Sequence, residues 1–125
     1  MTISVGDTAT VAFTVHEEDT AIAVGSGDVP VLGTPRLIAW CEAATVAAVT
    51  GGLDLGQTTV GSNVSIDHLA PTAVGGSVTV MASVSAVDGR QVTFEVSATD
   101  DNAPIGRGTV TRVVVDRERF VSRLG

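Results

Sequence analysis

Three side chains stand out as groups that could act together on a substrate: the carboxylate of Glu42, the imidazole of His68 and the hydroxyl of Thr34. A carboxyl group and an imidazole that lie close together can exchange a proton near neutral pH, because burial and a nearby imidazolium shift the carboxyl pKa in opposite directions. A hydroxyl at the start of a helix lies beside free N–H groups that favour developing negative charge. Together these groups could activate water or attack an acyl carbon. The alternative is that Thr34 only caps a helix and His68 only occupies a turn.

The element that must position Glu42 is a helix predicted over residues 34–50, roughly 25 Å long at the usual helical rise. Thr34 is expected to cap its amino end, Pro35 to take the first helical position, and Gly51 to close the other end in a left-handed conformation. The helix is apolar on almost every side, which predicts that a sheet wraps around it. Glu42 is its only acidic residue, and a carboxylate buried there must be paired, hydrogen-bonded or protonated.

Five further segments are predicted to be strands, mostly because apolar and polar residues alternate along them. They are residues 8–15, 58–66, 77–87, 92–98 and 106–115, with turns expected at 88–89 and 100–104. This order predicts an α+β fold, a single domain over residues 1–125 in which an antiparallel β-sheet is wrapped around one long central helix. Because one sheet covers only one side of the helix, we expect a homodimer or a dimer of dimers.

Composition narrows the range of partners. Fourteen acidic residues against seven basic ones give a net charge of −7, which would repel nucleic acid or an anionic bilayer, so neither is an expected partner. The single cysteine, Cys41, cannot form an internal disulfide and is expected to pack as a small apolar residue. No secretory signal is visible at the amino end, which favours the cytoplasm. No group of His, Cys and carboxylate residues has the spacing of a metal site, so no metal is expected.

The order and spacing of eight short motifs cover nearly the whole chain. They are Thr34-Pro35, Glu42-Ala43-Ala44, Val60-Gly61, His68-Leu69, Gly75, Asp88-Gly89-Arg90, Phe94-Glu95-Val96 and Gly108-Thr109. This pattern resembles the fluoroacetyl-CoA thioesterase family of hotdog-fold proteins. The resemblance implies a hotdog fold and hydrolysis of an acyl-CoA thioester at a dimer interface, with Thr34, Glu42 and His68 as catalytic residues. It also implies that the Gly61 backbone lines the carbonyl site and that Arg112 lies near the pocket. Coenzyme A would be part of the substrate, so no separate cofactor is implied.

One segment departs from that family. Its fluoroacetate-specific member has phenylalanines before the helix, where this chain has Gly25-Ser26-Gly27-Asp28. We therefore expect a short or medium acyl group, with this segment able to move as a lid. Glu42 could act as general base on water or as nucleophile, and the sequence does not choose between them. Two other interpretations are a hotdog protein that binds an acyl-CoA or small metabolite without catalysis, and a hydratase, whose acid and histidine lie closer together in sequence.

Overall fold

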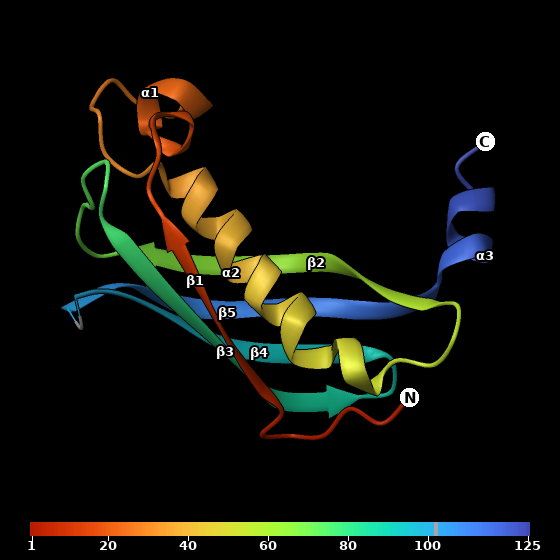
Figure 1. Ribbon diagram of the computed structural model, residues 1–125. Helices are drawn as coiled ribbons and strands as arrows, with labels where there is room; N and C mark the ends of the chain where they lie inside the picture. The colour runs from red at the N-terminus through yellow and green to blue at the C-terminus, as the bar shows by residue number, and fades with distance from the viewer. Residues whose placement is uncertain (102) are drawn as a thin grey trace.

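Five antiparallel strands and one long helix make up the fold, in a computed structural model that describes residues 1–101 and 103–125 (Figure 1). The strands are β1 (Thr8–Thr14), β2 (Gln57–His68), β3 (Ser77–Asp88), β4 (Gln91–Asp100) and β5 (Ala103–Asp116). They hydrogen-bond in the order β1-β3-β4-β5-β2, so β1 and β2 are the two edges. The predicted α+β architecture is confirmed. The turn expected at 100–104 includes residue 102, which lies outside the described residues.

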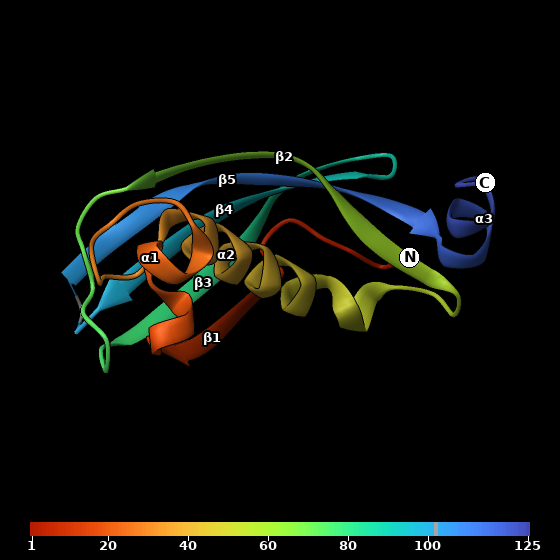
Figure 2. The same cartoon turned by 90° about the horizontal axis from the view of Figure 1, so that it is seen from above.

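The long helix α2 (Thr34–Val49) lies on one face of the curved sheet, as Figure 2 shows from above. Its buried side packs on the valines that the strands turn toward it, and the Trp40 ring stacks on Phe13 of β1 with centroids 4.5 Å apart. The buried helical residues are Leu37, Trp40, Cys41, Ala44, Thr45 and Val49. Burial of this stripe holds α2 in place because apolar area is removed from water on both surfaces.

The opposite side of α2 is uncovered. Pro35, Ala39, Ala43 and Ala47 are exposed and recur every four residues, which places them in one stripe along the helix. This agrees with the expectation that, within a single chain, the sheet covers only one side of the helix. One sheet can cover only one face, and the remaining apolar stripe is left open.

Both helix ends differ from the prediction. Gly33 is the N-cap of α2 and Thr34 is already inside the helix, since the Gly33 carbonyl accepts the Leu37 N–H at 3.1 Å. A β-carbon at Gly33 would lie 2.7 Å from Val24 Cγ2, so this position favours glycine. At the other end the chain tightens into a 3₁₀ turn, η2 (Thr50–Gly52), and Gly51 does not adopt a left-handed conformation. The Thr34 hydroxyl is thus free of a capping role.

Short helices complete the chain: η1 (Glu17–Asp19), α1 (Ala21–Val24) and, after β5, α3 (Arg117–Ser122). The η1–α1 lobe sits over the start of α2, whereas α3 projects at the far end of the sheet (Figure 1). Helix α3 was not predicted from the sequence; its first turn is capped by the Asp116 carboxylate, which accepts the Arg119 N–H at 2.9 Å. In the described part of the chain, no helix has both the length and the apolar character needed to cross a bilayer.

Candidate active site

The first polar group lies at the start of α2. Thr34, in the first helical turn, and His68, the last residue of β2, meet through a hydrogen bond of 2.8 Å between Thr34 Oγ1 and His68 Nδ1. His68 is therefore on a strand and not in a turn. The two residues are 34 positions apart in sequence, so the contact depends on how α2 packs against the end of β2.

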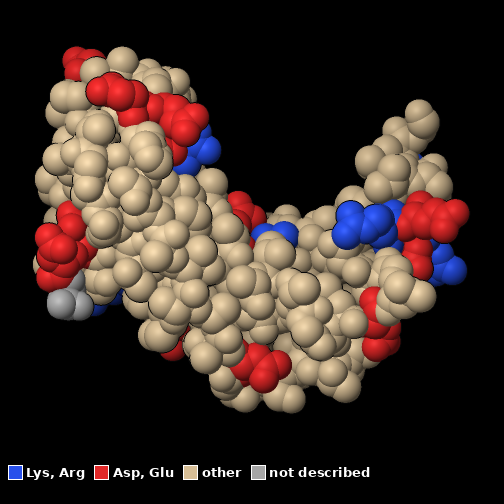
Figure 3. All heavy atoms as spheres, in the orientation of Figure 1, with Lys and Arg blue, Asp and Glu red and all other residues tan. Residues whose placement is uncertain are grey.

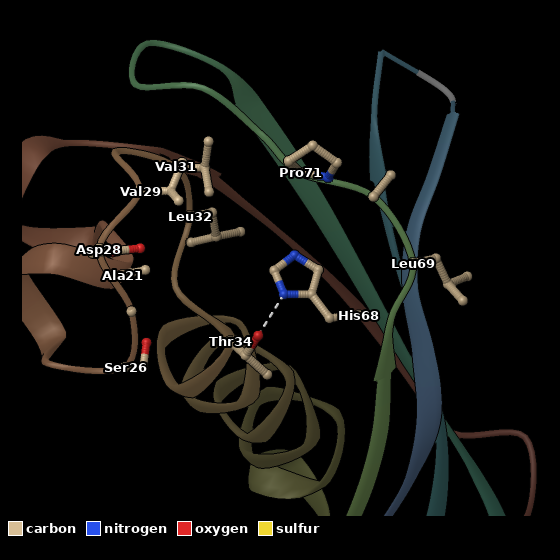
Figure 4. A pocket seen from close by; sticks show the side chains of 12 residues that line it. Ala21, Ser26, Asp28, Val29, Val31, Leu32, Thr34, His68, Leu69 and Pro71 are labelled. Carbon is tan, nitrogen blue, oxygen red and sulfur yellow. Dashed lines mark hydrogen bonds between the residues drawn. The ribbon is translucent and has the colours of Figure 1, made fainter.

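A pocket of about 360 Å³ opens at this pair (Figure 4). Its other walls come from the segment between α1 and α2 and from the chain after β2. The lining residues that matter most are Ser26, Asp28, Val31, Leu32, Leu69 and Pro71. The pocket thus has apolar walls, a polar rim from the segment expected to be a lid, and the Thr34–His68 pair at its side.

The imidazole of His68 is held neutral. Burial lowers its pKa below the ordinary value of 6.5, and a smaller backbone contribution from Ala70 opposes that shift. The second ring nitrogen, Nε2, is buried and makes no hydrogen bond of good geometry with any described residue, so the Ala70 contact is weak. A buried nitrogen without a partner is uncommon in proteins, and here it belongs to a pocket-lining residue.

The second polar group lies two turns further along α2. Glu42 Oε2 accepts a hydrogen bond of 3.0 Å from Arg112 NH1 of β5, and the two side chains form an ion pair. Arg112 is 7 % exposed and also donates through Nε to Thr59 Oγ1 at 2.8 Å and through NH2 to the Thr59 carbonyl at 3.1 Å. Three bonds therefore fix the guanidinium, which in turn fixes one oxygen of Glu42.

Glu42 was expected to be buried in the core, but it is only partly buried. Its side chain is 35 % exposed, and no described residue hydrogen-bonds to Oε1. Arg112, not His68, is the partner that offsets the cost of partial burial. One carboxylate oxygen is anchored and the other is open to the surface. In the space-filling view an acidic and a basic group meet at the floor of the hollow between the η1–α1 lobe and α3 (Figure 3).

Gly61 makes room for this carboxylate. It pairs with Arg112 across the β2–β5 ladder, next to an irregularity between Gly61 and Asn63. A β-carbon at Gly61 would lie 2.5 Å from Glu42 Oε2 and 3.5 Å from Arg112 NH1. A side chain at this position would push the Glu42 carboxylate away from where Arg112 holds it, which explains a glycine inside a strand.

The structure thus brings the predicted residues together as two groups, Thr34 with His68 and Glu42 with Gly61 and Arg112. Eight residues separate Thr34 from Glu42, a rise of about 12 Å along the helix. No hydrogen bond joins the groups among the described residues, so the expected direct pairing of Glu42 with His68 is not formed within one chain. Sequence reasoning also missed Thr59. Its two-residue spacing from Gly61, on the same face of β2, is the signal that could have found it.

Two other groups of candidate residues are engaged in packing or in helix capping. Burial, together with the Glu42 carboxylate, raises the pKa of the Cys41 thiol to about 11, so this cysteine stays protonated and packs as expected. His16, Glu18 and Asp19 place potential ligand atoms within 4.8 Å of one another. Asp19 is already engaged, however, by Arg36 at 3.1 Å and by the His16 N–H at 2.8 Å, which is the arrangement of a helix cap.

Comparison with known proteins shows which family has this fold and this arrangement of residues. A family described as fluoroacetyl-CoA-specific thioesterase matches residues 15–118. The fluoroacetyl-CoA thioesterase of Streptantibioticus cattleyicolor is 34% identical over 94 residues, which are 75% of this chain and 68% of that enzyme. A solved structure of the fluoroacetyl-CoA thioesterase FlK has a TM-score of 0.92 at 30% identity and covers 99% of this chain and 96% of its own.

More distant structures agree on the class. A thioesterase superfamily member from Thermus thermophilus has a TM-score of 0.90 at 25% identity, covering 98% of this chain and 90% of its own. A hot-dog-like protein from Thermanaerovibrio acidaminovorans has a TM-score of 0.85 at 26% identity, covering 97% of this chain and 93% of its own. The protein is thus a hotdog-fold thioesterase, which confirms the predicted fold and enzyme class. Within that class, the chain belongs to the fluoroacetyl-CoA-specific thioesterase family.

Proposed function

We propose that this enzyme hydrolyses the thioester of a short or medium acyl-CoA to a free acid and coenzyme A. The Thr34–His68 hydrogen bond beside the pocket is the observation that carries the proposal. A neutral imidazole with one nitrogen bonded to a hydroxyl and the other unpartnered can exchange a proton with a bound group. The reaction needs no separate cofactor, because coenzyme A arrives with the acyl group.

In the proposed reaction, a water oxygen bonds to the acyl carbon and the carbon–sulfur bond breaks. Glu42 takes the proton from water through the open oxygen Oε1, while Arg112 holds Oε2. The sulfur leaves with the bonding electron pair and is protonated by way of His68, and Thr34 orients the imidazole and the carbonyl. The alternative route, with Glu42 attacking the acyl carbon to give a mixed anhydride that water cleaves, remains open. A single turnover in ¹⁸O water distinguishes them, since only the anhydride route leaves label in the Glu42 carboxylate.

Pocket size and lining support the choice of substrate. A volume of about 360 Å³ suits a short or medium acyl chain. Its lid segment contributes Ser26, Gly27 and Asp28, and the described lining residues include no phenylalanine or tryptophan. The aromatic residues that the fluoroacetate-specific relative has in this segment are thus replaced by small and polar ones. We therefore propose that fluoroacetyl-CoA is not the preferred substrate.

We also propose that the active enzyme is a homodimer, or a dimer of dimers, in which each site uses both chains. β2 is an edge strand, and the uncovered stripe of α2 lies on the same side of the molecule as Glu42. Antiparallel pairing of two β2 strands around Val64 would place Gly61 of the partner subunit opposite Asp67, the neighbour of His68. Glu42 of the partner subunit would then face the Thr34–His68 pair. Such a dimer joins the two groups that a single chain keeps apart.

Mixed dimers test this arrangement. Glu42→Gln and His68→Gln should each abolish turnover as homodimers. If each site combines two chains, refolding the variants together restores one intact site per mixed dimer, about a quarter of wild-type activity in an equal mixture. If each site lies within one chain, every site in the mixture carries one substitution and activity stays absent. Sedimentation at micromolar concentration checks that the dimer forms at all.

A thiol-release assay across acetyl-, butyryl-, hexanoyl-, branched and aromatic acyl-CoAs tests the function itself. We expect release with at least one of these thioesters and loss of release in Glu42→Ala with the fold intact. Absence of thiol release by the wild type with every one of these thioesters would contradict the proposed range of acyl groups. A cytoplasmic location is part of the proposal, in keeping with the free thiol of Cys41.

A further inference from the structure

The pocket beside the Thr34–His68 pair has polar groups on two opposite sides. The pair itself forms one side, and the segment before α2 contributes the Ser26 hydroxyl and the Asp28 carboxylate to the other (Figure 4). All other side chains that line the pocket are apolar. A ligand that fills this pocket therefore meets a second polar surface beyond the reacting pair.

The Asp28 carboxylate has no partner of its own. Among the residues that the structure describes, none forms an ion pair or a side-chain hydrogen bond with it. No arginine lines the pocket, and the chain contains no lysine. Arg36, the basic residue closest to Asp28 in sequence, is engaged by Asp19 at 3.1 Å. An acceptor group is thus available in the pocket without a donor from the protein to meet it.

The loop that carries Asp28 is fixed to the rest of the fold at both ends. The Ala21 N–H donates to the Val31 carbonyl at 2.8 Å, and the Ser26 N–H donates to the Ala21 carbonyl at 2.9 Å. An isolated bridge between Val31 and Ala73 joins the same loop to the chain after β2. These bonds hold the loop beside the pocket, with the carboxylate across from His68 (Figure 4).

This position of Asp28 favours one kind of acyl group. An alkyl chain that ends beside the carboxylate would remove its water without replacing the lost hydrogen bonds, which costs free energy. A chain that ends in an O–H or N–H group supplies the donor that the protein does not, and the Ser26 hydroxyl offers a second contact. A site that hydrogen-bonds a substrate hydroxyl or amine discriminates against the analogue that lacks it. Because Asp28 is exposed, this discrimination is modest, about fivefold.

We propose that the enzyme selects short acyl groups that end in a hydrogen-bond donor, a hydroxyl or an ammonium group, and that Asp28 is the residue that selects them. The aliphatic walls of the pocket bind the methylenes of such a group, and the carboxylate binds its polar end. The inference rests on the proposed hydrolysis of an acyl-CoA, since it names the class of acyl group at the same site.

Three thioesters of equal chain length test this selectivity: butyryl-, 3-hydroxypropionyl- and 3-aminopropionyl-CoA, which end in a methyl, a hydroxyl and an ammonium group. The wild type should hydrolyse at least one of the two donor-ended thioesters with a kcat/KM about fivefold above that for butyryl-CoA. Asp28→Ala should remove this preference. Asp28→Asn keeps an acceptor oxygen without the charge, so it should retain a preference for the hydroxyl and lose one for the ammonium group. Glu95→Ala, which removes the same charge from the sheet face opposite α2, is the matched control and should leave the preference unchanged.

Binding of thioethers separates this inference from the proposed function. S-butyl-, S-(3-hydroxypropyl)- and S-(3-aminopropyl)-coenzyme A have no carbonyl to hydrolyse, and calorimetry measures their affinities. Tighter binding of a donor-ended thioether, lost in Asp28→Ala and kept in Glu95→Ala, supports the selectivity even if no thioester is hydrolysed. Hydrolysis of all three thioesters at equal kcat/KM, or fastest hydrolysis of butyryl-CoA, overturns the selectivity while the thioesterase function stands. A preference for donor-ended groups that persists in Asp28→Ala also overturns the role of Asp28.

Discussion

The two polar groups on α2 are held in different ways. Glu42 is anchored by Arg112, which makes two further hydrogen bonds to Thr59, and Gly61 fits closely beneath it. The Thr34–His68 pair depends on a single hydrogen bond and leaves a buried ring nitrogen unpartnered. One group is therefore complete within the chain, whereas the other has bonding capacity left over at a pocket. This difference indicates that the carboxylate is preorganised and that the imidazole is the part that awaits a ligand.

The largest expected loss of activity comes from adding a methyl group next to the Glu42 carboxylate. Gly61→Ala would place a methyl group 2.5 Å from Glu42 Oε2, so either the carboxylate or the strand must move. Displacement of a reacting group by about 1 Å lowers kcat/KM about 100-fold. Thiol release measures the loss, and circular dichroism checks that the fold persists. Gly51→Ala is the matched control, because nothing lies within 4 Å of the added carbon and its backbone conformation is ordinary. A Gly61→Ala enzyme of normal activity would show that Glu42 need not be held in this position.

A smaller effect is expected at the Thr34–His68 pair, which depends on one hydrogen bond. Thr34→Val removes the hydroxyl that bonds His68 Nδ1 and should lower kcat/KM about tenfold, the equivalent of one neutral hydrogen bond. Thr34→Ser keeps the hydroxyl and should restore most of the activity. Equal losses in the serine and valine variants would indicate that the methyl group matters and the hydrogen bond does not. That result would weaken the contrast between the two groups.

The pH dependence sharpens the comparison further. Because burial lowers the pKa of His68 below 6.5, the imidazole is neutral between pH 8 and 7, and turnover should stay level over that range. At a lower pH, protonation of the imidazole should abolish turnover. The unfolded chain takes up this proton near its ordinary pKa and the folded chain only at lower pH, so stability rises with pH between those two values. His68→Gln should remove this part of the slope of melting temperature against pH. A wild-type rate that already declines between pH 8 and 7 would contradict a neutral His68.

An independent check concerns the cysteine that adjoins Glu42. Since the pKa of Cys41 is raised to about 11 and the side chain is 1 % exposed, iodoacetamide at neutral pH should neither label nor inactivate the folded enzyme. Labelling should appear once denaturant is added. Rapid labelling of the native protein would show that α2 opens near Glu42, and the description of this group as rigid would fail.

Most of the helices and strands could be predicted from the sequence, because they depend on local patterns of apolar and polar residues. Alternation marked the five strands, and the apolar run with Pro35 marked α2. The partner of Glu42 could not be read in this way, since Arg112 lies 70 residues away and no local signal links them. The Thr34 cap was mistaken by one residue, because the Gly33 carbonyl already accepts a helical N–H and the Gly33 N–H is held by the distant Asp19 carbonyl, a tertiary contact. The contacts that could not be predicted are thus those between residues that are far apart in the sequence and meet only in the folded chain.

The smallest expected effect tests whether support for Glu42 extends to Thr59. Thr59→Val keeps the shape of the side chain but removes the acceptor of Arg112 Nε, leaving a buried donor unsatisfied. This should lower the free energy of unfolding by about 1–3 kcal/mol and reduce kcat/KM only a few-fold, because two bonds of the guanidinium remain. Denaturant unfolding and thiol release measure the two quantities. Thr10→Val, at an exposed position of β1, should change neither. If Thr59→Val impairs turnover as severely as Gly61→Ala, the position of Glu42 depends on the whole chain of contacts behind it and not on its nearest neighbours alone.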